Sequence, residues 1–185
     1  MKINNLFKSF DKKIIFNNAS FEFEDGKITY IMGGSGIGKT TLLRIISGLD
    51  ASYSGEIIKN GELAYVFQEP RLFPTLNLEE NIKIASESSK FDIDNLLEIV
   101  ELKDFKNFMP SELSGGMKSR VSLVRAIYKD ADIYIMDEPF SNLDEDLKKR
   151  IIPKIFELLK EKTILIVSHD PKEAEKYSDN IIYLK

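Results

Sequence analysis

The chain has 185 residues, enough for one domain with a continuous core. Its hydrophobic fraction of 43% and charged fraction of 30% are ordinary for a globular protein, and its net charge of -4 argues against a general nucleic-acid-binding protein, which would carry a basic face. The absence of cysteine excludes disulfides and thiolate metal sites and favours a cytoplasmic location.

The first part of the chain is predicted to consist of strands. Alternating or β-branched segments lead to Asp25-Gly26, a pair that predicts a tight turn into the last strand of the region. That last strand is apolar enough to be buried, and the segments before it indicate an antiparallel arrangement. We predict strands over residues 3–7, 13–16, 19–24 and 27–32.

A glycine-rich segment joins the buried strand to a short helix predicted over residues 41–48. Residues 33–40 match the phosphate-binding pattern G-x-x-x-x-G-K-[ST]. Glycines let successive backbone N–H groups turn toward phosphate oxygens, and a helix N-terminus adds partial positive charge there. We therefore predict a nucleoside triphosphate site in which Lys39 reaches the β- and γ-phosphates and the Thr40 hydroxyl binds Mg²⁺. The predicted binding residues are Gly33, Gly34, Ser35, Gly36, Ile37, Gly38, Lys39, Thr40 and Thr41.

Between residues 78 and 129 the pattern changes from strand-like to helical, which predicts an inserted helical subdomain. Asp92 and Ser114 can each cap a helix that has one apolar face. Strands and helices alternate again afterwards, and Pro153 predicts a kink or a break inside a long helix at residues 144–162. Further strands are predicted over residues 55–61, 63–67, 131–136, 163–167 and 181–184, with a short helix from Pro171.

Together these elements predict an α/β fold of the P-loop NTPase class in a single domain, residues 1–185. We expect a mainly parallel core sheet, an N-terminal antiparallel β subdomain and the helical subdomain. The strand at residues 131–136 leads to Asp137 and Glu138, at the sheet edge where the phosphate loop also lies. Asp137 is predicted to hold Mg²⁺, and Glu138 to polarise an attacking water.

One more motif precedes a predicted helix, namely Leu113-Ser114-Gly115-Gly116-Met117. A serine cap and two glycines at a helix N-terminus can cradle an anion. With this motif between the phosphate loop and the Asp-Glu strand end, the chain resembles ATPases of the ATP-binding cassette (ABC) family over essentially its whole length. Gly34, Met117 and Asn142 depart from the commoner residues of the family, but none removes a group that touches phosphate or metal.

The resemblance implies further site residues. Gln68 corresponds to a glutamine that contacts Mg²⁺ and the attacking water, and His169, the only histidine, to a residue that contacts the γ-phosphate. Asp144 lies in the family's D-loop and is expected to join the nucleotide site. Phe10 stands where the family has an aromatic that stacks on adenine, with a core phenylalanine as an equal alternative. Ser114, Gly115 and Gly116 would bind the ATP held by a second copy.

The resemblance also implies partners. Two copies would close head to tail around ATP and reopen after hydrolysis, acting on a membrane-spanning permease that docks around residues 69–81. The chain would then lie peripherally on the cytoplasmic face of the cell membrane, without nucleic acid. Residues 65–74 and 113–118 are similar to the nitrate, sulfonate and taurine group of bacterial importers. An exporter-type ATPase and a soluble ABC ATPase without a permease remain as alternatives.

Overall fold

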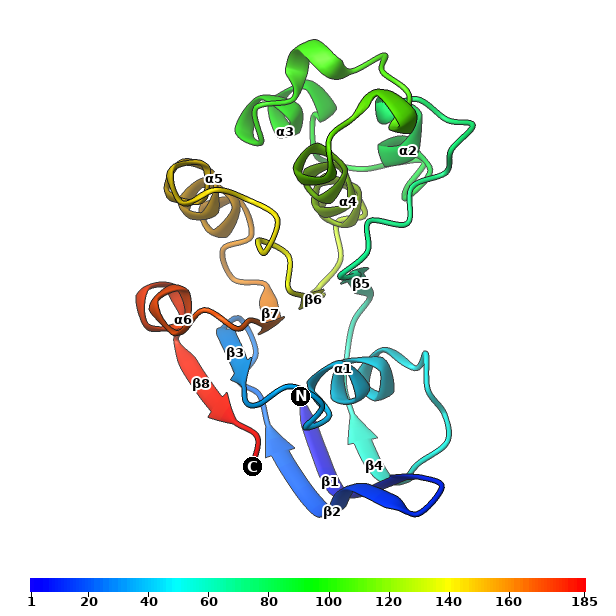
Figure 1. Cartoon of the computed structure of the whole chain (residues 1–185), viewed down its shortest axis with the longest axis vertical. Helices are drawn as coiled ribbons and strands as arrows, with labels where there is room; N and C mark the ends of the chain where they lie inside the picture. Colours follow the sequence, from blue (N-terminus) through cyan, green and yellow to red (C-terminus); the bar gives the residue numbers. More distant parts are fainter.

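The computed structural model describes all residues of the chain, 1–185, as two sheets surrounded by helices (Figure 1). The strands are β1 (Lys2–Phe10), β2 (Lys13–Glu22), β3 (Ile28–Met32), β4 (Ser54–Ile58), β5 (Leu63–Val66), β6 (Ile133–Asp137), β7 (Thr163–Val167) and β8 (Asn180–Tyr183). The α-helices are α1 (Lys39–Ser47), α2 (Leu78–Lys83), α3 (Ile93–Ile99), α4 (Gly115–Tyr128), α5 (Glu145–Leu158) and α6 (Pro171–Tyr177). Two single 3₁₀ turns, Lys103–Phe105 and Pro110–Glu112, lie between α3 and α4. None of these helices combines the length and apolar composition needed to cross a lipid bilayer.

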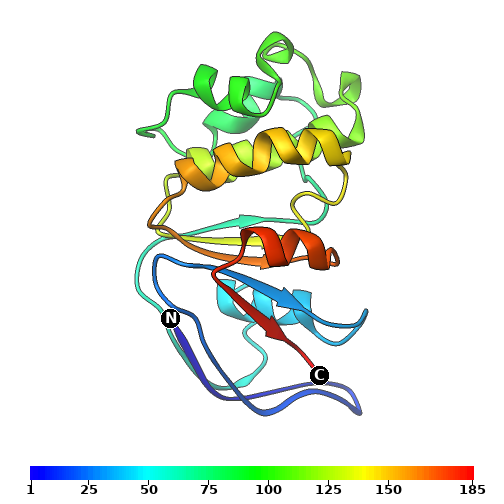
Figure 2. The same ribbon diagram turned by 90° about the vertical axis from the view of Figure 1, so that its left-hand side faces the viewer.

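The core sheet is parallel throughout and has the strand order β5-β6-β7-β3-β8. Every residue of β6 and β7 is buried, as expected for a sheet that is covered on both faces. Successive residues of β3 divide between the two faces. Tyr30 packs into the core shared with α4 and α5, whereas Ile31 packs into the core shared with α1 and the second sheet. Figure 2 shows α5 (orange) above the sheet and α1 (cyan) below it. The predicted parallel α/β core is therefore confirmed.

The second sheet is antiparallel, with the order β2-β1-β4, and lies below α1 in Figure 1. The prediction of two separate strands at residues 13–16 and 19–24 is wrong, because β2 is one continuous strand from Lys13 to Glu22. Asn18 adopts a left-handed φ of 55° inside β2, and the pairing with β1 shifts register several times. A polar residue in such a bulge interrupts the sequence alternation without ending the strand. The turn at Asp25-Gly26 is present, and it carries the chain from this sheet to the parallel one.

The segment from α2 to α4 is helical, as predicted. The Asp92 carboxylate accepts a hydrogen bond from Asn95 N (2.9 Å) and caps α3, and the Ser114 hydroxyl accepts one from Met117 N (3.3 Å) and caps α4. In Figure 1 these helices form the end of the molecule farthest from the antiparallel sheet. The far end of α4 returns to the parallel sheet and packs on β5.

Pro153 lies in the interior of α5, and the helix continues through it. The predicted break is therefore wrong, and the helix ends at Leu158 rather than residue 162. Pro153 is on the exposed face, whereas Ile151, Ile152 and Ile155 are fully buried against the sheet. A proline inside a helix costs about 3 kcal/mol, which the burial of three isoleucines at about 1.5–3 kcal/mol each outweighs.

Candidate nucleotide-binding site

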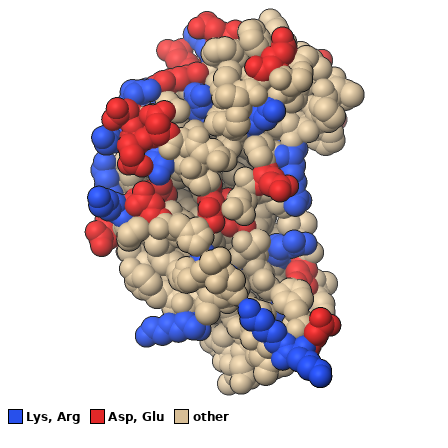
Figure 3. All heavy atoms as spheres, in the orientation of Figure 1, with Lys and Arg blue, Asp and Glu red and all other residues tan.

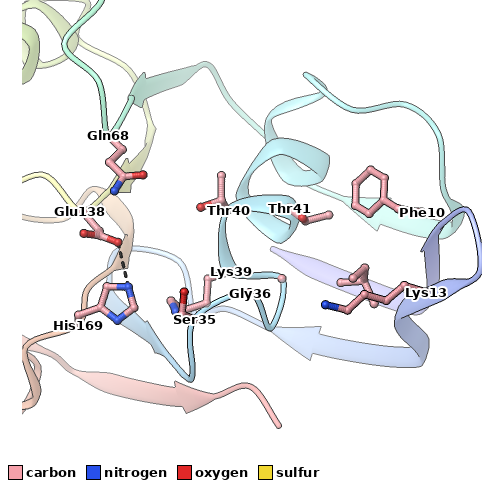
Figure 4. A pocket seen from close by; sticks show the side chains of 12 residues that line it. Phe10, Lys13, Ser35, Gly36, Lys39, Thr40, Thr41, Gln68, Glu138 and His169 are labelled. Atoms are coloured by element: carbon pink, nitrogen blue, oxygen red, sulfur yellow. Dashed lines mark ion pairs between the residues drawn. The ribbon is translucent and has the colours of Figure 1, made fainter.

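A cleft of about 470 Å³ opens at the carboxyl ends of the parallel strands, where β3, β5, β6 and β7 deliver their following loops (Figure 4). This edge of a parallel sheet is where ligands bind in open α/β folds. The figure shows the phosphate loop between two groups of side chains, with Gln68, Glu138 and His169 on one side and Phe10 and Lys13 on the other. The lining residues are Phe10, Lys13, Ile15, Ser35, Gly36, Gly38, Lys39, Thr40, Thr41, Gln68, Glu138 and His169.

The phosphate loop connects β3 directly to α1. Gly38 stands immediately before the helix at a left-handed φ of 113°, and a Cβ atom there would lie 2.5 Å from Ile15 Cγ2 of the antiparallel sheet. Only glycine fits this position, since both the backbone conformation and the space exclude a side chain. No side chain caps α1, and its first turn has no acidic residue, so its N-terminal N–H groups are free to bind an anion.

Lys39 is buried beneath this loop. Its Nζ donates to the carbonyl oxygens of Gly33 (2.8 Å) and Gly34 (3.0 Å). These hydrogen bonds join the end of the loop, where Lys39 lies, to its beginning. Gly33, Gly34 and Ile37 do not line the cleft themselves. Their contribution is to the shape of the loop that Lys39 closes.

Asp137 is the last residue of β6 and is 2% exposed. Burial raises the pKa of its carboxyl, and a hydrogen bond with Thr40 acts in the opposite direction. Its Oδ1 is buried without any hydrogen-bond partner. A carboxylate oxygen of this kind needs a partner, and a hard cation such as Mg²⁺ would supply one. No group of three acidic, histidine or cysteine side chains is arranged to hold a metal ion by itself, so Mg²⁺ bound at Asp137 would need further ligands from phosphate and water.

Glu138 follows β6 directly and points into the cleft (Figure 4). Its backbone has a left-handed φ of 51°, and its N–H donates to Val167 O at the end of β7 (2.9 Å). His169, two residues beyond β7, places Nε2 3.0 Å from Glu138 Oε1. Strained backbone held by neighbouring strands is common at functional sites. The adjacent strands β6 and β7 therefore place the Glu138 carboxylate and the His169 imidazole next to each other in the cleft.

The far end of the cleft belongs to the antiparallel sheet. Phe10, the last residue of β1, is 50% exposed and lines the cleft, so it is not a core residue. The ammonium of Lys8 lies 4.5 Å from its ring centroid. Stacking of Phe10 on adenine stays a prediction.

Two lining residues, Lys13 and Ile15, were absent from the predicted site. Lys13 pairs directly with Phe10 across the β1–β2 turn. A tight hairpin places such residues side by side, so the strand prediction for this region contained the signal. Ile15 reaches the cleft because it packs against Gly38, and this contact between the antiparallel sheet and the phosphate loop has no signal in local sequence.

Ser114, Gly115, Gly116 and Asp144 do not line this cleft. Asp144 Oδ1 accepts from Leu147 N (2.9 Å) and caps α5, and this hydrogen bond lowers the pKa of its carboxyl.

The Ser114 motif lies against residues 141–144, the segment that corresponds to the family's D-loop, within the same chain. Asn142 Nδ2 donates to Ser119 Oγ (3.0 Å), and a Cβ atom on Gly116 would lie 2.9 Å from Asn142 O. Within one chain, the Ser114 motif therefore does not reach the nucleotide cleft.

Comparison with known proteins gives consistent matches. The sequence profile of the ABC transporter family matches residues 16–141. The aliphatic sulfonates import ATP-binding protein SsuB of Bacillus cereus is 36% identical over 100% of this chain and 80% of its own length. A solved ATP-binding subunit of an ABC transporter superposes with a TM-score of 0.88 at 26% identity, covering 99% of this chain and 85% of the other.

A second solved structure is a dimeric ATP-binding cassette in a post-hydrolysis state, bound to ADP and Pi. It superposes with a TM-score of 0.84 at 28% identity, covering 100% of this chain and 94% of the other. The family profile covers more than half of the chain, and the sulfonate relative aligns over all of it. The chain therefore belongs to the ABC transporter family, as an ATP-binding subunit that hydrolyses ATP.

Proposed function

We propose that this subunit binds Mg²⁺-ATP in the cleft at Lys39, hydrolyses it with Glu138 and His169, and energises an import permease. The observation that carries the proposal is the cleft itself. It joins the phosphate loop to a carboxylate–imidazole pair 3.0 Å apart, next to a buried aspartate oxygen without a partner. Phosphoryl transfer needs this set of groups: a charged cradle, a metal ligand and a group that orients water.

The roles of the side chains follow from their positions. The N–H groups at the start of α1 and the Lys39 ammonium bind the phosphates, and Thr40, Asp137 and Gln68 would hold Mg²⁺. Mg²⁺ neutralises charge on the phosphate oxygens when it is bound. Glu138 accepts the proton of the attacking water, while His169 holds the carboxylate in place and faces the γ-phosphate.

A second copy completes the site. Because the Ser114 motif and the cleft lie apart in one chain, the motif can reach a nucleotide only from another subunit. A two-fold, head-to-tail pair makes both composite sites from a single sequence. The dimeric state of a structural relative supports this arrangement. ATP would then favour the closed pair, and loss of the γ-phosphate would release it.

A groove beside edge strand β5 is the docking surface that we propose for the permease. The groove has a volume of about 400 Å³ and is mainly apolar. Arg125 donates to the carbonyl oxygens of Pro70 and Arg71, and so ties α4 to the segment after Gln68. Phe73 is 48% exposed beside it. The lining residues are Leu63, Ala64, Tyr65, Phe67, Arg71, Phe73, Ala85, Arg125, Ala126 and Lys129.

Asn81 braces the same region. Its side chain is fully buried, accepts from Phe73 N (2.7 Å) and donates to the carbonyl oxygens of Phe73, Leu76 and Asn77. The loop at residues 73–77 is therefore fixed to α2. A rigid loop that carries an exposed phenylalanine is suited to anchor the permease and to pass movements of this subunit on to it. The direction of transport is proposed to be import, because relatives of this chain are named import proteins.

A complementation assay tests the shared site. Lys39→Ala damages the phosphate loop and Ser114→Glu damages the motif, so each variant alone should be inactive. In a mixture, a dimer of one subunit of each variant has one intact composite site, formed by the phosphate loop of the Ser114→Glu subunit and the motif of the Lys39→Ala subunit. We expect the mixture to regain ATPase activity, up to about a quarter of the wild-type rate for random two-fold pairing. Failure to regain activity, with both variants folded and soluble, would contradict the composite site.

The permease is tested separately by capture from detergent-solubilised membranes of the native cell. A membrane-spanning protein should be retained by the wild type and lost with Phe73→Asp. Tyr183→Asp is the matched control, since Tyr183 is exposed on β8, at the opposite edge of the parallel sheet from β5. Equal capture by all three proteins would refute the groove as the docking surface.

A further inference from the structure

A second cavity, of about 220 Å³, shares Glu138 and His169 with the nucleotide cleft. Seven of its nine lining residues are polar or charged, and three of them are acidic, namely Glu138, Asp170 and Glu173. Lys148 is the only lysine or arginine among the lining residues. The nucleotide mechanism uses neither Lys148 nor Glu173.

Lys148 connects two helices that carry different parts of the site. It lies in α5, which begins directly after Asp144, and its side chain is 14% exposed. Its Nζ is 3.2 Å from Glu145 Oε1 in the same helix, 3.6 Å from Asp170 Oδ2 and 3.7 Å from Glu173 Oε2. Asp170 follows His169 directly and caps α6. One ammonium therefore joins the start of α5 to the segment that carries the histidine.

Glu173 fixes the other side of this cluster. Its side chain is 5% exposed, and Tyr30 Oη lies 3.2 Å from its Oε1. Tyr30 belongs to β3, the strand that runs into the phosphate loop. Burial raises the pKa of Glu173, and the charge of Lys148 opposes this. The carboxylate thus stands between the phosphate-loop strand, α5 and α6.

Burial sets Lys148 apart from its neighbours. The surface over α5 and α6 carries many side chains of both signs, along the left side of Figure 3. The next residue, Lys149, pairs with Asp146 at 3.1 Å and is 61% exposed, so it contributes little. Without Lys148, the carboxylates of Asp170 and Glu173 would face that of Glu138 across one cavity with no lysine or arginine among them. Their repulsion would move the segment after β7 away from α5.

We infer that Lys148 is a positioning residue for hydrolysis: by binding Asp170 and Glu173 it holds His169 against Glu138 and couples the histidine to the start of α5. Lys148 does not line the nucleotide cleft, so we expect its effect on hydrolysis to be transmitted through His169. The inference rests on the proposed role of His169. It adds that α5, the helix that begins directly after Asp144, sets the position of the histidine.

Steady-state ATPase kinetics test the inference. Lys148→Met should lower kcat by roughly 10- to 100-fold, the effect of about 1 Å of misplacement at a reacting group, with KM for ATP within about twofold. Lys148→Arg should restore most of the loss, and Lys149→Met should match the wild type. Lys148→Gln replaces the methionine variant if that protein does not fold. Unchanged kcat in folded Lys148→Met and Lys148→Gln would overturn the inference.

Two measurements separate positioning from general stability. First, the combination of His169→Ala with Lys148→Met should be no slower than His169→Ala alone, because Lys148 acts through the histidine. A further loss by the full Lys148→Met factor would overturn the inference. Second, His169 is the only histidine in the chain, so its ring signals in a ¹H–¹³C NMR spectrum need no assignment.

These ring signals should shift in Lys148→Met and stay in place in Lys149→Met, at fixed pH. If His169→Ala hydrolyses ATP at the wild-type rate, the proposed role of the histidine fails. The NMR comparison still decides the position of its ring. A signal that shifts supports positioning by Lys148, and a signal that does not shift overturns it.

Discussion

Replacing Glu138 with glutamine removes the acceptor of the water proton and keeps the shape of the side chain. The backbone contacts that hold residue 138, its N–H to Val167 O at 2.9 Å and its φ of 51°, do not depend on the carboxylate. The glutamine oxygen can still accept from His169 Nε2, which lies 3.0 Å from Glu138 Oε1. The fold and the nucleotide cleft should therefore persist, so that the whole effect falls on the chemical step.

A general base contributes roughly 10²- to 10⁴-fold to turnover, or about 2.7–5.5 kcal/mol of barrier. We expect Glu138→Gln to lose activity in this range, to bind ATP like the wild type, and to accumulate as an ATP-bound dimer. Phosphate release measures the first property, nucleotide fluorescence the second and size-exclusion chromatography with Mg²⁺-ATP the third. Glu175→Gln, at an exposed position on α6, is the matched control. Wild-type turnover in Glu138→Gln would refute the assignment of the base.

Three further outcomes are expected. Lys39→Ala removes the ammonium that closes the phosphate loop and should weaken ATP binding itself, measured by nucleotide titration. Gly116→Ala places a Cβ atom 2.9 Å from a backbone oxygen and should lower the melting temperature, whereas Gly115→Ala, which meets open space, should not. Asp50→Asn leaves the buried ammonium of Lys8 without a counter-charge, with the carbonyl oxygen of Ser52 still accepting from it, and should lower the free energy of unfolding by about 3 kcal/mol in urea. A hydrogen bond from Lys8 lowers the pKa of Asp50. The wild type should therefore lose the stability that this ion pair contributes as the pH falls from about 4 through the lowered pKa. The variant lacks the carboxyl and should show no such loss.

Local patterns in the sequence were enough to predict the parts of the fold that have local causes. The phosphate loop has a fixed pattern of glycines between a buried strand and a helix, and the strand before Asp137 is continuously apolar. The caps at Asp92 and Ser114 were predictable for the same reason, because capping involves residues only three positions apart.

The errors arose where tertiary packing overrides a local signal. Pro153 predicts a kink or a break in α5, but the helix is not broken, because the buried isoleucines around it hold it together. The cluster of Lys148 and Glu173 could not be predicted either. These two residues lie 25 positions apart, on separate helices, and meet only because α5 and α6 both pack beside β3 and β7. Single charged residues on helices are usually solvated, so nothing local marks this pair.

The two ends of the cleft are built by different sheets. Phe10 and Lys13 come from the antiparallel sheet, whereas Glu138 and His169 follow strands of the parallel one. Under the proposed stacking of Phe10 on adenine, recognition of the base and cleavage of the phosphate would be encoded in separate modules, which meet at the contact between Ile15 and Gly38. Under the same proposal, substitutions confined to the first hairpin could change which base is bound, and the residues that break the phosphoanhydride bond would stay unchanged.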